Sequence, residues 1–258
     1  MKKLMALLLA VICIFTFAGC SAQNSAAERL ENKQVIIGVD DTFAPMGFRD
    51  EQGNLVGFDI DLANELLGRM GYTAEFQVID WSMKEAELEN GNIDLIWNGY
   101  TITDKRKEKV NFTQSYLSNR QIIIVLADSE IKTKSQLADK TVAVQKESSA
   151  YDAVMADDIA AKLAGGEPVQ FDTNTDAFMD LEAGRSDAMV ADEVFARYYI
   201  KLRGEEKYKV LGDDFGNEEY GIGVRKSDTE LLKEIDDTLG KMMADGSFDR
   251  LKSEWFSE

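Results

Sequence analysis

Two stretches of the chain share the frame L-E-x-G-x-x-D, namely LENGNID at residues 88–94 and LEAGRSD at residues 181–187. Each frame runs on into a short apolar segment, Leu95 to Trp97 in the first case and Ala188 to Val190 in the second. The pattern predicts that a helix ends, that the glycine takes the left-handed conformation, and that a buried strand follows. The same helix–strand unit is therefore expected twice.

Polar residues follow both predicted strands, at Asn98 to Thr101 and at Asp192 to Glu193. In open α/β sheets, ligands bind beyond the carboxyl ends of the strands. The two polar ends are therefore candidate parts of one binding site. The alternative is that two ordinary α/β units share a common turn, since a match this short can also arise by chance.

The rest of the chain indicates two series of α/β units with parallel sheets and crossover helices. Expected helix starts are Asp59, a Ser82–Glu85 capping box and a Ser227–Glu230 capping box. No proline-rich or serine-rich linker separates the two series, so we expect two lobes joined by extended segments. Strands are predicted at 35–39, 74–79, 93–97, 121–127, 141–144, 169–171, 186–190, 208–211 and 220–224, and the second series has helices at 149–163, 175–183 and 193–201.

The first nineteen residues are predicted to be an export signal. Two lysines precede an apolar run at residues 4–17, which is shorter than the roughly 20 residues that span a membrane. Cys20 follows Ala18-Gly19, as in the bacterial lipobox, where the cysteine is lipidated and becomes the N-terminus. The alternative is an ordinary secretion signal with an incidental cysteine. Residues 20–29 are then expected to form a flexible polar tether.

The chain contains no histidine, and its two cysteines are Cys13 in the predicted signal and Cys20. These absences argue against Ser-His and Cys-His catalysis, disulfides and histidine- or cysteine-ligated metals, so no metal and no cofactor are expected. The formal net charge of −18 also disfavours nucleic acid as a partner.

Arg106 lies in the first turn of a short helix predicted at residues 103–109. The helix dipole disfavours a cation there, and functional sites are where such rules tend to break. The alternative is a solvated surface arginine beside Lys105 and Lys107.

Several segments together resemble the third family of bacterial extracellular solute-binding proteins, the amino-acid receptors of ABC importers. The resemblance covers the chain in order after the signal, and GFDIDL and T-I-T-D-x-R are its most specific parts. It implies an α/β fold of two lobes, like a Venus flytrap, with two connecting hinge strands. Lobe one would comprise residues 30–116 and 219–258, and lobe two residues 117–218. The matching segments are VIIGVDDTFAPMGF, GNLVGFDIDLANEL, DLIWNGYTITDKRKEKVNF, DAMVADE and YGIGV.

The resemblance also implies a role for each matching position. Arg106 would grip the α-carboxylate of an amino acid, and Asp192 would pair with its α-ammonium group from the other lobe. Gly99 and Thr101 would add backbone and hydroxyl bonds, and Phe43 and Trp81 would sandwich the side chain. The second-lobe turn at Ser148 and Ser149 would close over the carboxylate, while Asp40, Asn98 and Gln145 would face the variable end of the ligand.

Plainer structural interpretations exist for several of these residues. Phe43 and Trp81 could be ordinary core residues, Asp192 a helix N-cap, and Ser148 and Ser149 a helix cap. Asp40 could accept bonds from a side-chain amide or pair with a guanidinium or ammonium group. The sequence therefore predicts a polar L-amino acid of the glutamine, arginine/lysine or cystine class, and not one identity.

The predicted function is the substrate-binding component of an ABC importer that captures its ligand by hinge closure. The expected partners are the amino acid, a permease with its ATPase, and the membrane through the lipid at Cys20, outside the cytoplasm. The protein itself is expected to be a monomer. Two alternatives are an enzyme on the same scaffold, such as a cyclohexadienyl dehydratase, and a ligand-sensing module.

Overall fold

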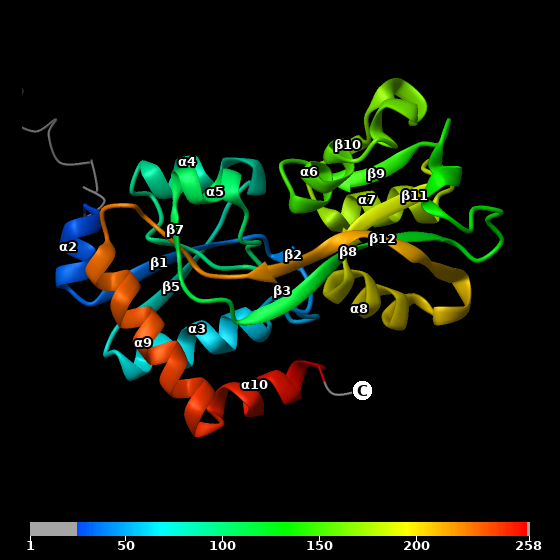
Figure 1. Ribbon diagram of the computed structural model, residues 1–258. Coiled ribbons are helices and arrows are strands. Elements are labelled where there is room, and N and C mark those ends of the chain that lie inside the picture. The colour runs from blue at the N-terminus through cyan, green and yellow to red at the C-terminus, as the bar shows by residue number, and fades with distance from the viewer. Residues whose placement is uncertain (1–24, 257–258) are drawn as a thin grey trace, which may run out of the picture.

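The computed structural model describes residues 25–256, which form two α/β lobes side by side, joined by two strands (Figure 1). This confirms the two-lobed fold. The predicted signal at residues 1–19, the lipidation site Cys20 and the first part of the tether lie outside the described residues. Among residues 25–256, no helix combines the length and the apolar character needed to cross a bilayer.

The first lobe is built on a five-stranded sheet whose order is β5-β1-β6-β13-β7. Strand β1, an interior strand of this sheet, is buried on both faces, since Val35, Ile37 and Val39 enter one apolar cluster and Ile36 enters another. Figure 1 shows α4 and α5 above this sheet and α3 and α9 below it. The strands are β1 (Gln34–Val39), β5 (Thr73–Val78), β6 (Leu95–Ile96), β7 (Asn111–Phe112) and β13 (Gly223–Val224), and the helices are α3 (Phe58–Arg69), α4 (Lys84–Glu89), α5 (Asp104–Lys109), α9 (Thr229–Asp245) and α10 (Ser247–Phe256).

A small antiparallel sheet, β2-β3-β4, completes this lobe beside the cleft. It comprises Thr42–Phe43, Gly47–Arg49 and Leu55–Val56. The terminal helix α10 packs back onto this lobe through its buried residues Phe248 and Leu251.

The second lobe contains a sheet of order β10-β9-β11-β8-β12. Strands β9, β10 and β11 are parallel to one another, and β8 runs antiparallel to both of its neighbours, β11 and β12. Its strands are β8 (Leu117–Leu126), β9 (Val142–Gln145), β10 (Val169–Phe171), β11 (Ala188–Asp192) and β12 (Tyr208–Tyr220), and its helices are α6 (Ser149–Ala156), α7 (Asn174–Glu182) and α8 (Glu193–Arg203). The helix expected at 149–163 thus ends at Ala156, where Asp157 turns to extended backbone and a short 3-10 turn follows.

The duplicated frame forms the same turn in both lobes. Gly91 and Gly184 have φ values of 77° and 66°, so both take the left-handed conformation predicted for them. The aspartate that ends each frame accepts a hydrogen bond from the backbone N–H of the neighbouring strand: Asp94 from Ile36 at 3.0 Å and Asp187 from Thr141 at 2.9 Å. The frame therefore fixes a helix end and the start of a parallel strand pair.

The chain crosses between the lobes twice, along β8 and β12, which run antiparallel side by side (Figure 1). The two short strands expected at 208–211 and 220–224 are instead one long strand, β12, followed by β13. Pairing with β8 carries β12 past Gly212 and Gly216, where the register shifts. The lobe limits 116/117 and 218/219 stay predictions, because β12 passes through the second limit without a break.

Three predicted helix starts are wrong. Helix α3 begins at Phe58 after Gly57, and Asp59 does not cap it. Near Ser82, the cap is Asp80, whose carboxylate accepts from the Ser82 amide and hydroxyl, so the Ser82–Glu85 box does not form. Helix α9 follows Asp228 without a side-chain cap, so the Ser227–Glu230 box is also absent.

The tether prediction is wrong from residue 25 onward. Ser25 and Glu28 form a capping box that opens helix α2 (Ala26–Glu31). Arg29 of this helix is buried, and its guanidinium binds both carboxylate oxygens of Asp94. This tertiary ion pair orders a segment whose polar composition alone predicts flexibility.

Candidate ligand-binding site

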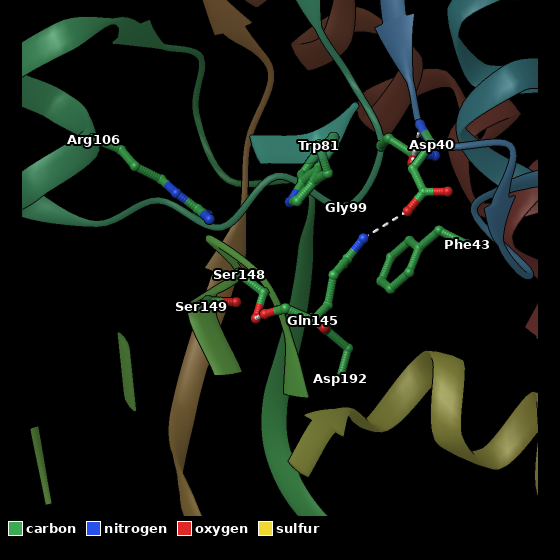
Figure 2. Close-up of a pocket in the computed structure, with 10 residues that line it drawn as sticks. Asp40, Phe43, Trp81, Gly99, Arg106, Gln145, Ser148, Ser149 and Asp192 are labelled. Atoms are coloured by element: carbon green, nitrogen blue, oxygen red, sulfur yellow. Dashed lines mark hydrogen bonds between the residues drawn. The ribbon is translucent and has the colours of Figure 1, made fainter. Parts of the chain in front are cut away.

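A narrow cleft with a volume of about 10 Å³ lies between the closed lobes, at the carboxyl ends of strands from both sheets (Figure 2). Figure 2 shows Arg106 on one side and Asp40 with Phe43 on the other. The structure thus brings together nearly all of the predicted residues. The cleft is lined by Asp40, Phe43, Trp81, Asn98, Gly99, Arg106, Gln145, Ser148, Ser149 and Asp192.

Asp40 and Gln145 meet across the cleft. Asp40 follows β1, and its Oδ1 accepts from the amide and hydroxyl of Thr42 at 2.9 and 2.7 Å. Gln145 ends β9 of the other lobe, and its Nε2 donates to Asp40 Oδ2 at 2.8 Å. Burial raises the pKa of Asp40, although the bonds from Thr42 and Gln145 oppose the rise. The Gln145 amide oxygen accepts from Asn174 Nδ2 at 2.8 Å, so this end of the cleft offers chiefly the carboxylate of Asp40 to a polar group.

Asn98 anchors Asp40 from the neighbouring strand, since its Oδ1 accepts from the Asp40 amide at 3.0 Å. Asn98 is buried just after β6, the strand that follows the first L-E-x-G-x-x-D frame. Among the described atoms its Nδ2 has no hydrogen-bond partner.

Arg106 is buried, with only 4 % of its surface exposed, so the interpretation as a solvated arginine is wrong. Its Nη1 donates to the carbonyl of Thr101 at 3.0 Å, and its Cζ lies 4.6 Å from the centre of the Tyr100 ring. The nearest carboxylate, Glu85, is 3.9 Å from Nε. A guanidinium held in this way presents a rigid fork that suits a carboxylate.

Asp192 lies in the opposite lobe, at the end of β11, and is 4 % exposed. Although Asp192 precedes helix α8, its side chain makes no capping bond. Its Oδ1 instead accepts from Asn119 Nδ2 at 2.8 Å and from the Tyr220 hydroxyl at 2.5 Å. Burial, and then the nearby charge of Glu218, raise the pKa of Asp192 well above its ordinary value. A positively charged ligand group bound beside Asp192 would stabilise its ionised carboxylate and so lower its pKa.

Phe43 and Trp81 belong to the core and line the cleft at the same time. Phe43 stacks on Phe195 of the second lobe, with 5.7 Å between ring centres. Trp81 meets Tyr100 edge-on at 6.0 Å. Their interpretation as core residues is therefore confirmed, while the sandwich around a ligand side chain stays a prediction.

The two serines and Thr101 have different positions. Ser148 caps α6, since its hydroxyl accepts from the Tyr151 amide at 3.1 Å. Ser149 Oγ accepts from Thr101 Oγ1 across the lobes at 3.0 Å. Thr101 itself is buried behind the lining and is not among the residues that form the cleft wall. In this conformation the Thr101 hydroxyl therefore bonds the opposite lobe and stabilises the closed arrangement.

The backbone N–H of Gly99 is already bonded within the protein, so the predicted backbone bond to the ligand is left to its carbonyl oxygen and stays a prediction. The Gly99 N–H donates to Asp59 Oδ2 at 2.7 Å, and the same oxygen accepts from the Tyr116 hydroxyl at 3.0 Å. Gly99 has φ of 58°, and a Cβ there would lie 2.7 Å from the Phe43 ring. Asp59 is therefore a site residue that the sequence reasoning missed, because it was interpreted as a helix cap. Its position in the distinctive GFDIDL segment was the available signal.

Asp59 is fully buried, and burial raises its pKa to about 7. A folded-state pKa above the unfolded value means that the folded protein holds an extra proton between about pH 4 and pH 7. We therefore expect the unfolding free energy of the wild type, relative to Asp59→Asn, to fall by up to about 1.4 kcal/mol per pH unit across this window. Urea unfolding of both proteins from pH 4.5 to 8 measures this difference, and a flat difference would contradict the assignment.

Lys84 is a second residue near the cleft that sequence reasoning did not select. It is 1 % exposed, and its Nζ donates to the carbonyls of Trp81 at 3.1 Å and Glu147 at 3.0 Å. Burial lowers its pKa to about 8. Because Glu147 belongs to the second lobe, this bond forms only when the lobes are closed, as they are here.

Comparisons with known proteins agree with this architecture. A model of the bacterial extracellular solute-binding proteins, family 3, matches residues 35–258. The L-cystine-binding protein TcyJ of Escherichia coli K12 is 29% identical over 256 residues, covering 96% of this chain and 94% of its own.

Solved structures are similar over nearly the whole chain. A substrate-binding protein of an ABC uptake transporter from Streptococcus pneumoniae, solved with histidine, is 38% identical with a TM-score of 0.87, covering 92% of this chain and 98% of its own. An ancestral amino acid-binding protein, a precursor of cyclohexadienyl dehydratase, is 34% identical with a TM-score of 0.81, covering 90% and 99%. The chain therefore belongs to family 3 of the bacterial extracellular solute-binding proteins.

Proposed function

We propose that the protein captures a polar L-amino acid between its lobes and delivers it to an ABC permease and its ATPase. The observation that carries this proposal is the placement of Arg106 and Asp192. They are buried groups of opposite charge, from opposite lobes, that line one cleft. Such a pair complements the carboxylate and the ammonium group of a zwitterion, and each charge-assisted hydrogen bond contributes roughly 1.5–3 kcal/mol.

Closure follows from the same arrangement. A ligand that touches both lobes binds the closed form better than the open form, and this difference in affinity drives the lobes together. Arg106, Gly99 and Trp81 would hold the amino acid on the first lobe, while Asp192 and the turn at Ser148 and Ser149 would complete the site on closing. The relatives that bind cystine or histidine support an amino acid as the ligand.

The end of the cleft away from Arg106 selects the chemical class of the ligand side chain. Asp40 and Gln145 occupy it together near two aromatic residues, Phe43 and Trp81. The acceptors there are the carboxylate oxygens of Asp40, to which Gln145 donates through its amide nitrogen. A side-chain amide, ammonium or guanidinium group fits these acceptors, and the aromatic faces also suit a cation. We therefore place the ligand in the glutamine, arginine/lysine or cystine class.

A thermal-shift screen of the twenty amino acids with ornithine and cystine tests this function. A specific ligand at a hundredfold excess over its Kd should add about 2.7 kcal/mol to the unfolding free energy. Polar members of the set should raise Tm, and leucine and valine serve as apolar controls. Absence of any shift, or turnover of prephenate during incubation, would overturn the proposal of a binding protein without enzymatic activity.

The extracytoplasmic location agrees with the family. We further propose that Cys20 carries the lipid anchor and that the protein acts as a monomer. Two acyl-type chains hold a protein stably at a membrane surface. Mass spectrometry of the mature N-terminal peptide would detect the lipid on Cys20, and an unmodified peptide would refute the anchor.

A further inference from the structure

The carboxylates of Asp192 and Glu218 lie close together beside the proposed site for the ligand's amino group. Asn119 Nδ2 donates to Asp192 Oδ1 at 2.8 Å and to Glu218 Oε1 at 2.6 Å. Acids that share one amide nitrogen are close enough for each charge to disfavour the other. Glu218 therefore adds negative potential to the position where Asp192 faces the cleft.

Glu218 lies on β12 and is fixed by two residues of the other hinge strand, β8. Its Oε1 also accepts from Gln121 Nε2 at 2.8 Å, and Gln121 Nε2 in turn donates to Ser149 Oγ at 3.1 Å. Ser149 receives the bond from Thr101 of the first lobe. A connected set of hydrogen bonds thus runs from the closed lobe contact, through β8 and β12, to Asp192.

The cations on the strands and helices around Asp192 and Glu218 pair with other carboxylates and do not neutralise these two. On β8, the Arg120 guanidinium binds Glu193 at 2.6 Å and Asp214 at 3.3 Å. On α8, Arg197 also binds Glu193. From β12 the Tyr220 hydroxyl donates to Asp192, and from the first lobe Arg106 lines the same cleft. The side chains that donate hydrogen bonds to Asp192 and Glu218 are thus the neutral groups of Asn119, Gln121 and Tyr220.

We propose that Glu218 is a second carboxylate of the amino-group site, and that its negative charge keeps a proton on Asp192 while the cleft is empty. Binding of an ammonium group then expels this proton to solvent, because the cation takes over the neutralisation of the pair. The proposal rests on the amino-acid function and reaches beyond it, since it assigns a positioning role to a hinge residue that does not line the cleft. Amino-acid capture thereby becomes coupled to proton release.

Calorimetry with L-arginine, L-glutamine and L-cystine in turn, in buffers of different ionisation enthalpy, measures the protons released between pH 5 and 8. For the wild type we expect close to one proton per bound amino acid at the acid end and none at the alkaline end. In Glu218→Gln, the midpoint of this release should move down by about one to three pH units, the size of a like-charge shift.

Glu219→Gln is the matched control. It makes the same change of charge one residue along β12, where Glu219 instead bonds Ser115 and Ser118 at the surface. Its proton-release profile should equal that of the wild type. Identical profiles for all three proteins, or the same shift in both variants, would overturn the role of Glu218.

A second measurement needs no amino acid and so separates this inference from the proposed function. Because Asp192 holds this proton only in the folded protein, the wild type should lose stability relative to Glu218→Gln as pH rises. The Tm of Glu218→Gln minus that of the wild type should therefore increase from pH 5 to pH 8, while the difference for Glu219→Gln stays flat. A flat difference for both variants contradicts the effect of Glu218 on the Asp192 proton, whereas failure of every amino acid to bind contradicts the function.

Discussion

Arg106→Ala is expected to abolish amino-acid binding, with a loss of affinity of at least about a hundredfold, equivalent to about 2.7 kcal/mol. The variant removes the buried guanidinium that lines the cleft and would leave the ligand carboxylate without a charged partner. Isothermal titration calorimetry with the amino acid that gives the largest thermal shift measures the loss. Retained micromolar affinity would contradict the assignment.

Arg106→Lys is the matched variant for this prediction. It keeps the positive charge but lacks the fork that bonds a carboxylate through two nitrogens, so we expect an intermediate loss of affinity. Arg106 also donates to the Thr101 carbonyl, so its replacement can lower the stability of the fold as well as ligand affinity. The Tm of both variants is therefore measured together with the titration. A large loss of affinity with little change in Tm is the signature of a ligand contact.

Asp94→Ala is expected to be the most destabilising of the proposed substitutions, at about 3–5 kcal/mol. Asp94 is fully buried and accepts bonds from Arg29, from Arg225 at 3.3 Å and from the Ile36 amide. Without the carboxylate, two guanidinium groups lose their shared buried counter-charge. Urea unfolding at pH 7 measures the change in unfolding free energy.

Asp187→Ala provides the control, because Asp187 has the same place in the second frame. Asp187 is exposed and bonds the Thr141 amide, so its loss should cost about 1 kcal/mol or less. Equal costs for the two substitutions would show that the ion pairs of Asp94 contribute little. The comparison isolates burial and charge, since the local turn is the same in both lobes.

Features encoded by local conformation were predicted well from the sequence. The left-handed glycines at 91 and 184 follow from the turn itself, and the two strands they precede lead to Asn98 and Asp192 in the cleft. Arg106 was marked by its unfavourable place in the first turn of a helix, and it is buried as a functional residue would be.

Features that depend on contacts between distant segments were not predictable in the same way. Asp59 resembles a helix cap, yet its partners are Gly99 and Tyr116, 40 and 57 residues along the chain. The strand β12 is continuous because β8 pairs with it, although its two glycines indicate breaks. Lys84 is buried by a contact with the other lobe, which no local pattern reveals.

A crystal structure of the protein with a bound amino acid tests the central claim most directly. We expect the ligand carboxylate within hydrogen-bonding distance of the Arg106 guanidinium and its ammonium group within hydrogen-bonding distance of Asp192, with the side chain directed toward Asp40. A ligand that binds elsewhere, or that contacts neither charged group, would contradict the account.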